Sequence, residues 1–264
     1  MADAETKGPI CLLTDFGIED NYVGVMKGVI QSIAPGCAMI DLSHHIPPQD
    51  IRSAAFLLDH SVDYFAQGTI FLCVIDPGVG THRRKLAIDC GGHYFIGPDN
   101  GLLTSFLDAG RVHQIESDRH RLPQVSNTFH GRDIFAPAAA HLCCGVPLAD
   151  LGPKCQDPIR MESSEPAREG EDWLGEVVYV DRFGNLVTNF DSDRFLGVVE
   201  TGDFRVQTKG GVEWPFARTY AEVPNENRCS VMGGFFRLEL SINCGNASNR
   251  LGLSTGSQVC LVKS

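Results

Sequence analysis

Three predicted strands in the first third of the sequence end in carboxylates. The segments are ICLLTD, AMIDLS and TIFLCVID, and they supply Asp15, Asp41 and Asp76. Ligands of open α/β sheets bind beyond the carboxyl ends of the strands, so these side chains are candidates for one site. An aspartate at such a position is also a common helix or turn cap, and position alone does not separate the two uses.

Two turns beside these strands carry further groups that could reach a ligand. DPGVG joins a proline to two glycines, and such a turn lets backbone amides approach a ligand closely. Arg83 and Arg84 follow it, either as site residues or as a solvated corner. NTFHGRDIF opens a helix in which Asp133 is the expected cap, which leaves His130 free to serve a site.

A third turn, DRFGNLVTN, places Asp181, Phe183 and Asn185 around one glycine, and NCGNAS holds further amides near the C-terminus. An aromatic ring beside an amide can stack on a planar base and hydrogen-bond it. An ordinary hairpin turn is the alternative for both segments.

The sequence has no G-x-S-x-G, no HExxH and no evident nucleophilic cysteine, so covalent catalysis has little support. Noncovalent displacement or hydrolysis fits better. A metal-dependent phosphoesterase remains an alternative, although the spacing of the ligand types matches no standard metal motif. The side chains suited to a divalent ion are Asp15, His44, His45, Asp76 and His130.

Apolar strands alternate with amphipathic helices in the first part of the chain. One helix is expected to begin with Asp20 as its cap and a second to begin at Asp50. A third contains the His-Gly-Arg-Asp turn, with Pro137 bending or interrupting it near its start. This order predicts a Rossmann-like α/β domain with a mostly parallel sheet that is covered on both faces.

The polar, acidic stretch MESSEPAREGED is expected to be a linker. We place the domain boundary there, with an N-terminal domain over residues 1–165 and a smaller C-terminal domain over residues 166–264. The second part has short strands with glycine at most corners, which predicts an antiparallel β-barrel.

Composition excludes several classes of protein. The 264 residues are 43% hydrophobic, which indicates a globular protein with a real core. A net charge of -11 argues against nucleic acid as a partner. No stretch approaches the roughly 18 apolar residues of a membrane span, and the first ten residues do not read as a signal peptide. We therefore expect a cytoplasmic protein without a membrane partner, whose ten cysteines are mainly reduced.

Seven segments together resemble the S-adenosylmethionine (SAM) hydroxide adenosyltransferases, relatives of the SAM-dependent fluorinase and chlorinase. They are TDFGIEDNYVG, DLSHHIPPQD, VIDPGVGTHRR, FIGPDNGLLT, NTFHGRDIFAPAAA, VDRFGNLVTN and NCGNAS, in this order over nearly the whole chain. The resemblance implies hydrolysis of SAM to adenosine and L-methionine by in-line attack of water on the ribose C5′, with no cofactor or metal. It also implies a homotrimer whose active sites lie between the N-domain of one subunit and the C-domain of its neighbour.

The same resemblance assigns roles to particular residues. Asp76, Arg83 and His130 are associated with water activation. We interpret them as a clamp in which Asp76 accepts from water, His130 relays or accepts a proton, and Arg83 fixes Asp76 and tempers its charge. The substrate-binding positions are Asp15 at the ribose hydroxyls, Pro48 near the ribose, Asp20 and Asp181 at the methionine amino group, and Phe183, Asn185, Asn246 and Ala247 around the adenine.

The chain departs from its relatives at informative positions. Gly234 stands where relatives carry a serine that meets the methionine carboxylate. The halogenases have Tyr and Thr across the DPGVG position and Ser at Gly131, whereas this chain has Asp76, whose charge would repel a halide. A halogenase and a noncatalytic protein that binds adenosine or SAM are the alternatives to the hydrolase.

Overall fold

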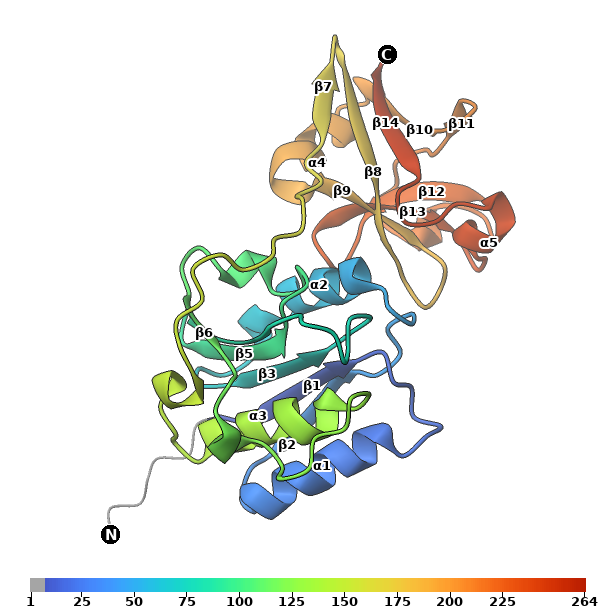
Figure 1. The fold of residues 1–264 in the computed structure, drawn as a ribbon. Helices are drawn as coiled ribbons and strands as arrows, with labels where there is room; N and C mark the ends of the chain where they lie inside the picture. The colour runs from blue at the N-terminus through green and yellow to red at the C-terminus, as the bar shows by residue number, and fades with distance from the viewer. Residues whose placement is uncertain (1–7) are drawn as a thin grey trace. The chain divides into compact units, whose positions relative to one another are not determined.

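The computed structural model describes residues 8–264, and the chain forms two compact units (Figure 1). The first unit ends at Met161, and the second runs from Glu162 to Ser264. Part of the expected linker is a strand instead, because β7 (Ala167–Glu169) pairs with β8 (Asp172–Val180). Backbone hydrogen bonds to β8 form this strand, and its side chains are exposed, so its polar sequence did not predict a strand.

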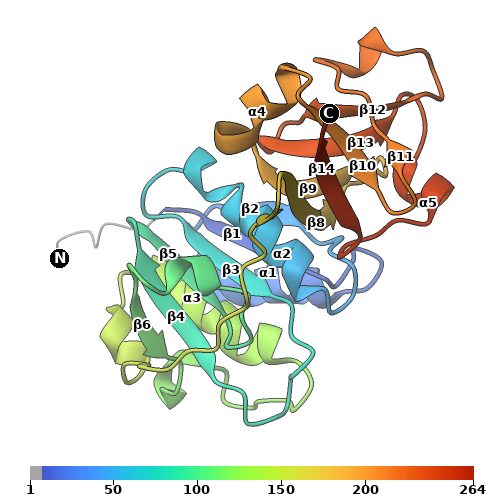
Figure 2. The ribbon, with the colours of Figure 1, turned by 90° about the horizontal axis from the view of Figure 1, so that it is seen from above.

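The N-terminal unit contains a six-stranded mixed sheet in the order β2-β1-β3-β5-β4-β6 (Figure 2). Its strands are β1 Ile10–Thr14, β2 Met39–Ser43, β3 Ile70–Val74, β4 Lys85–Cys90, β5 His93–Pro98 and β6 Arg111–Gln114. β1 pairs in parallel with β2 and β3, and β3 pairs in parallel with β5. β4 is antiparallel to β6, and it is antiparallel to β5 because Gly91 and Gly92, both at positive φ, form the tight hairpin turn between them.

Helices cover both faces of this sheet (Figure 1). They are α1 Tyr22–Ile33, α2 Ile51–Asp59 and α3 Ala136–Cys143. Ile10 and Leu12 of β1 pack in one core with residues of α1 and α3. Cys11 and Leu13 point to the opposite face and pack with residues of α2. The side chains of a strand alternate between faces, so a continuous apolar strand fits only between two covering layers.

The helix starts differ in part from the expectation. The helix expected from Asp50 is α2, and Asp50 is its cap, because its carboxylate accepts from the Ser53 amide at 3.0 Å. The expected cap of α1 by Asp20 is wrong: Asn21 takes the cap position, and no side chain there accepts a hydrogen bond. Asp20 instead lies exposed in the preceding loop.

The third helix begins with a π-helical turn, Gly131–Phe135, that runs into α3. Pro137 has no amide hydrogen to donate to the carbonyl of Asp133. That carbonyl accepts from the Leu122 amide at 2.9 Å instead. Pro137 thus accounts for the irregular start of the helix, and the widened turn sets the direction of the residues just before it.

The C-terminal unit contains an antiparallel sheet in the order β11-β10-β14-β8-β9-β13-β12, with β7 pairing to β8. The strands not yet given are β9 Leu186–Asp191, β10 Phe204–Thr208, β11 Val212–Glu213, β12 Arg228–Met232, β13 Arg237–Ile242 and β14 Gln258–Lys263. Two helices that we did not expect complete the unit, α4 Ser192–Glu200 and α5 Ala247–Leu251. Each is capped by the residue before it, since Asp191 and Asn246 accept backbone amides.

The second unit has its own core. Phe190, Phe195 and Trp214 are its largest buried side chains, and aliphatic residues of β13 and β14 pack around them. Burying each such side chain contributes on the order of 2–3 kcal/mol. Among the helices of residues 8–264, none is both long enough and apolar enough to cross a membrane.

Candidate active site

Asp76, Arg83 and His130 meet in the N-terminal unit, and Arg83 lies between the other two. Arg83 Nε donates to Asp76 Oδ1 at 2.8 Å, and Arg83 Nη2 donates to Asp76 Oδ2. Nη2 also lies 2.8 Å from His130 Nδ1. The side chains of Arg83 and Asp76 are only 8% and 5% exposed, and His130 is 7% exposed. The three residues thus form a buried, hydrogen-bonded group, named here the Asp-Arg-His group.

The DPGVG turn brings Arg83 back to the end of β3. The Val79 amide donates to the Asp76 carbonyl at 3.2 Å, and Gly80 takes a φ of +79°. A Cβ atom at Gly80 would lie 2.4 Å from the carbonyl oxygen of Asn127. Only glycine therefore permits this approach. Since Asn127 is three residues before His130, the contact also brings the two loops of the group together.

The contacts fix the protonation of His130. A guanidinium has only donors, so the Nδ1 atom that faces Arg83 must be the acceptor, and the single proton of the neutral ring lies on Nε2. Burial lowers the pKa of His130 below its ordinary value, and the charges of Arg83 and Lys85 lower it further. His130 is accordingly neutral at pH 7, with Nε2–H as a donor.

Asp15 lies at the same edge of the sheet as Asp76. Thr14 of β1 is in register with Val74 of β3, so each aspartate follows its strand by one or two residues. The Asp15 carboxylate accepts from the Gln49 amide at 2.8 Å, which holds it against the loop that contains the exposed Pro48. The structure thus brings Asp15 and the Pro48 loop together.

Two other aspartates of this unit do not fill the expected positions. Asp41 lies in the middle of edge strand β2 rather than at its end, and it contacts Lys27 and His44. Asp133 is not the helix cap, because it lies inside the π-helical turn and accepts from the Ser126 amide and from Arg132. Asp41 is not at a strand end because β2 continues to Ser43, and Asp133 is not a cap because the widened turn begins before it, at Gly131.

An aromatic cluster next to His130 was not foreseen from the sequence. The rings of Phe16, Tyr22 and Phe129 pack within 6.0 Å of one another, centroid to centroid. A Cβ atom at Gly131 would lie 3.2 Å from Met26 Sδ and 3.4 Å from Phe16 and Phe129. This crowding leaves little space for a side chain at Gly131.

The residues considered as metal ligands are placed otherwise in the structure. The His44 ring lies between Thr14 Oγ1 at 2.8 Å and Asp41 Oδ1 at 2.9 Å, so both of its nitrogens have partners. Within residues 8–264, no three His, Cys, Asp or Glu side chains form a group that could hold a metal ion.

In the C-terminal unit, Asp181 organises its own turn. Its Oδ1 accepts from the amides of Phe183 at 2.9 Å and Asn185 at 2.8 Å, and its Oδ2 accepts from Asn185 Nδ2 at 2.8 Å. The turn leaves the Phe183 ring 74% exposed. A large exposed ring beside a fixed amide is the arrangement that base stacking requires.

The NCGNAS segment contacts this turn at Gly184. The Ser248 amide donates to the Gly184 carbonyl at 3.0 Å. A Cβ atom at Gly184, whose φ is +86°, would lie 2.1 Å from Asn246 Cγ. Asn246 also caps α5 through the Asn249 amide at 2.7 Å, and Ala247 is fully buried beside it. Two segments far apart in the sequence, the Asp181 turn and NCGNAS, are therefore in contact.

A cavity of about 600 Å³ opens at the Asp181 turn, within the usual size of a ligand pocket. We call it the Asp181 cavity. Its lining residues are Asp181, Phe183, Asn185, Tyr220, Gly234, Phe235, Glu239, Ile242, Asn243, Cys244 and Gly245. Gly234 therefore faces the cavity, and no atom lies within 4 Å of the place where its Cβ would be. The sequence analysis did not identify Tyr220 or Glu239, although Glu239 is the lone charged residue in the segment LELSI.

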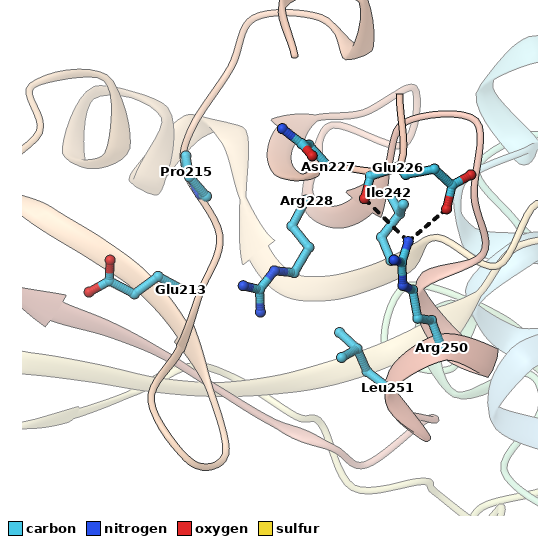
Figure 3. A pocket seen from close by; sticks show the side chains of 8 residues that line it. All are labelled: Glu213, Pro215, Glu226, Asn227, Arg228, Ile242, Arg250 and Leu251. Carbon is cyan, nitrogen blue, oxygen red and sulfur yellow. Dashed lines mark hydrogen bonds and ion pairs between the residues drawn. The ribbon is translucent and has the colours of Figure 1, made fainter. Parts of the chain in front are cut away.

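A second cavity of this unit, of about 640 Å³, contains none of the site residues predicted from the sequence (Figure 3). Its Arg250 donates to Glu226 Oε2 at 2.7 Å and to the Glu226 carbonyl at 3.2 Å. Arg228 lies with its guanidinium 6.0 Å from the centroid of the Trp214 ring. Both arginines thus have partners within the fold.

Substituting Gly184 tests whether its contact with Asn246 supports the turn. We expect Gly184→Ala to lower the free energy of unfolding by about 1–3 kcal/mol more than Gly202→Ala, since both have positive φ but only Gly184 would overlap another side chain. Urea unfolding of the two variants measures the difference. Equal losses would mean that backbone strain alone matters at Gly184.

The chain thus joins a mixed α/β unit that carries a buried Asp-Arg-His group to an antiparallel β unit that carries an aromatic and amide cavity. Residues 10–152 match the SAM hydroxide adenosyltransferase N-terminal domain, and residues 175–260 match the C-terminal domain of the same family. The protein belongs to the SAM hydroxide adenosyltransferase family.

Individual relatives agree with this assignment. The chain is 42% identical to a (R)-S-adenosyl-L-methionine hydrolase of Thermus thermophilus, over 96% of this chain and 99% of the relative. It is 27% identical to a fluorinase of Nocardia brasiliensis, over 81% and 82% of the two chains. The crystal structure of an uncharacterized conserved protein from Thermotoga maritima matches with a TM-score of 0.89 at 34% identity, over 96% of this chain and 100% of that one.

Proposed function

We propose that this protein hydrolyses SAM to adenosine and L-methionine, and that the (R) epimer at sulfur is its substrate. The observation that carries the proposal is the buried contact of Asp76, Arg83 and His130 at the carboxyl edge of the sheet. The hydrolase relatives, whose printed names specify the (R) epimer, support both parts of it.

The chemistry asks the protein mainly to position water. The water oxygen attacks the ribose C5′, the C5′–S bond breaks, and its electron pair neutralises the sulfonium. The leaving thioether therefore needs no acid catalyst, whereas the water must lie in line with the breaking bond. Such placement can contribute about 7–11 kcal/mol in favourable cases.

Within the group, Asp76 is the better proton acceptor. Each of its oxygens keeps acceptor capacity beyond the bonds from Arg83. His130 has Nδ1 engaged by Arg83 and a proton on Nε2, so it donates to the water oxygen and orients it. His130 in this state has no free ring nitrogen to accept the proton, although it could do so in the other tautomer.

We further propose the remaining site assignments that follow from the family. Asp15 would bind the ribose hydroxyls, with Pro48 near the ribose. The methionine amino group would meet Asp20 and Asp181, and the adenine would lie among Phe183, Asn185, Asn246 and Ala247. The exposed Phe183 ring and the Asp15–Pro48 loop contact support these roles.

The proposal extends to architecture and assembly. We infer a Rossmann-like N-terminal domain, a C-terminal antiparallel β-barrel, and a boundary near residue 165. A homotrimer would join the N-domain of one subunit to the C-domain of its neighbour at each active site. The ten free cysteines support a reducing, cytoplasmic location.

Incubation in oxygen-18 water tests the reaction. With SAM racemised at sulfur and chloride present, we expect the label in the 5′-hydroxyl of adenosine, loss of the (R) epimer and retention of the (S) epimer. Mass spectrometry and chromatography of the epimers measure both. The formation of 5′-chloro-5′-deoxyadenosine would identify a halogenase instead, and intact ligand after long incubation would identify a binding protein.

A further inference from the structure

Glu239 of β13 is a buried acid at the wall of the Asp181 cavity. It is 4% exposed, and Tyr220 donates a hydrogen bond to its Oε1. Among residues 8–264, no donor contacts its Oε2. A Cβ atom at Gly233 would lie 2.1 Å from Glu239 Cδ, so only glycine leaves space for this carboxyl group. A charged group this deeply buried is costly unless something compensates it.

The charges of the cavity wall are of one sign. Its lining includes the carboxylates of Asp181 and Glu239 and no lysine or arginine side chain. The three hydrogen bonds within its own turn already engage both oxygens of Asp181. Asp181 already accepts three bonds, whereas Oε2 of Glu239 accepts none from residues 8–264, so Glu239 is the carboxylate with the larger unused acceptor capacity. A cationic group is what two such carboxylates attract.

We propose that Glu239 is a binding residue for the ammonium group of the substrate's amino acid, and that Tyr220 positions its carboxylate by holding Oε1. This inference rests on the proposed function, because it names a contact for the methionine end of SAM. An ammonium group would give Oε2 the donor that the fold does not supply.

The affinity should depend on pH in one direction. Burial raises the pKa of Glu239, and Asp181 raises it further, whereas the hydrogen bond from Tyr220 lowers it. The titratable groups that face Glu239 are Tyr220 from the turn Tyr220–Glu222, Asp181 from the β8–β9 turn and Cys229 from β12. The carboxylate is lost as the pH falls through this raised pKa, so the affinity for an ammonium group falls on the acid side.

Two nucleosides that lack the sulfonium charge isolate the contact. S-adenosylhomocysteine keeps the ammonium group, and 5′-methylthioadenosine lacks the amino acid altogether. We expect Glu239→Gln to weaken S-adenosylhomocysteine binding by about tenfold to a hundredfold, the range for a hydrogen bond to a charged group, and to change 5′-methylthioadenosine binding less than twofold. Titration calorimetry measures both. Equal changes for the two ligands, or no change for either, would overturn the inference.

Tyr220→Phe tests the positioning role, because it removes the hydrogen bond but keeps the carboxylate. It should weaken S-adenosylhomocysteine binding by about threefold, less than Glu239→Gln does, and leave 5′-methylthioadenosine binding within about twofold. An unchanged affinity for S-adenosylhomocysteine would refute the positioning role of Tyr220. The wild-type protein supplies a test that needs no variant: acid pH should weaken S-adenosylhomocysteine binding more than 5′-methylthioadenosine binding, and parallel curves would refute the contact. These binding measurements do not depend on turnover. A protein that discriminates the two ligands but leaves SAM intact would therefore refute the hydrolase proposal and leave the Glu239 contact standing.

Discussion

Replacing Asp76 with asparagine should lower the kcat for SAM hydrolysis by about a hundredfold to ten-thousandfold and leave KM within about threefold. Asparagine is nearly the same size and can still accept one bond from Arg83, but its neutral amide cannot take a proton from water. General base catalysis by a placed side chain is worth this range of rate. A loss confined to kcat indicates an interaction made in the transition state. Steady-state kinetics with (R)-SAM provide the measurement.

Asp41→Asn is the matched control for this variant. Asp41 also contacts basic side chains, Lys27 and His44, but it lies within edge strand β2 rather than beyond a strand end. Its substitution should leave kcat within twofold. An Asp76→Asn enzyme with full turnover would remove Asp76 from the chemistry, and a large rise in KM alone would make it a substrate-binding residue.

Much of the N-terminal fold could be predicted because the order of apolar and polar residues indicates which positions are buried. The uninterrupted apolar runs of β1 and β3 are fully buried, and the stripes on α1 and α2 face the two cores. Helix α4 was missed, since its sequence SDRFLGVVE has only two buried side chains and its start depends on the Asp191 cap.

The Asp-Arg-His group could be predicted only in part. From the residues alone, Asp76 was a strand-end acid and Arg83 could equally have been a solvated corner. The contact between Gly80 and Asn127, which joins the loops of Asp76 and His130, links positions 47 apart and leaves no periodic pattern. The resemblance supplied that pairing. Glu239 was missed because both faces of strand β13 are buried along most of its length. An alternation of buried and exposed positions, which would have placed Glu239 on the buried side, is therefore absent from its sequence.

Arg83→Met should destabilise the protein by about 3–5 kcal/mol, because it leaves the buried Asp76 carboxylate without its guanidinium partner. Urea unfolding at pH 7 measures the loss. Arg111→Met is the matched control: Arg111 also contacts an aspartate, Asp89, but its side chain is 77% exposed. A surface pair contributes only about 0–1 kcal/mol. Losses of equal size would mean that Arg83 is not needed to compensate Asp76.

The same variant should change the pH dependence of both stability and activity. In the wild type, the lowered pKa of His130 means that the unfolded chain binds its proton first as the pH falls through about 6.5, so stability is lost on the acid side. Without the Arg83 charge, and with Nδ1 free to bind a proton, the pKa of His130 rises. The acid limb of kcat should then move to higher pH, because protonated His130 repels the sulfonium and no longer has the hydrogen-bonding pattern that orients water. An unmoved acid limb in Arg83→Met would show that a group other than His130 controls it.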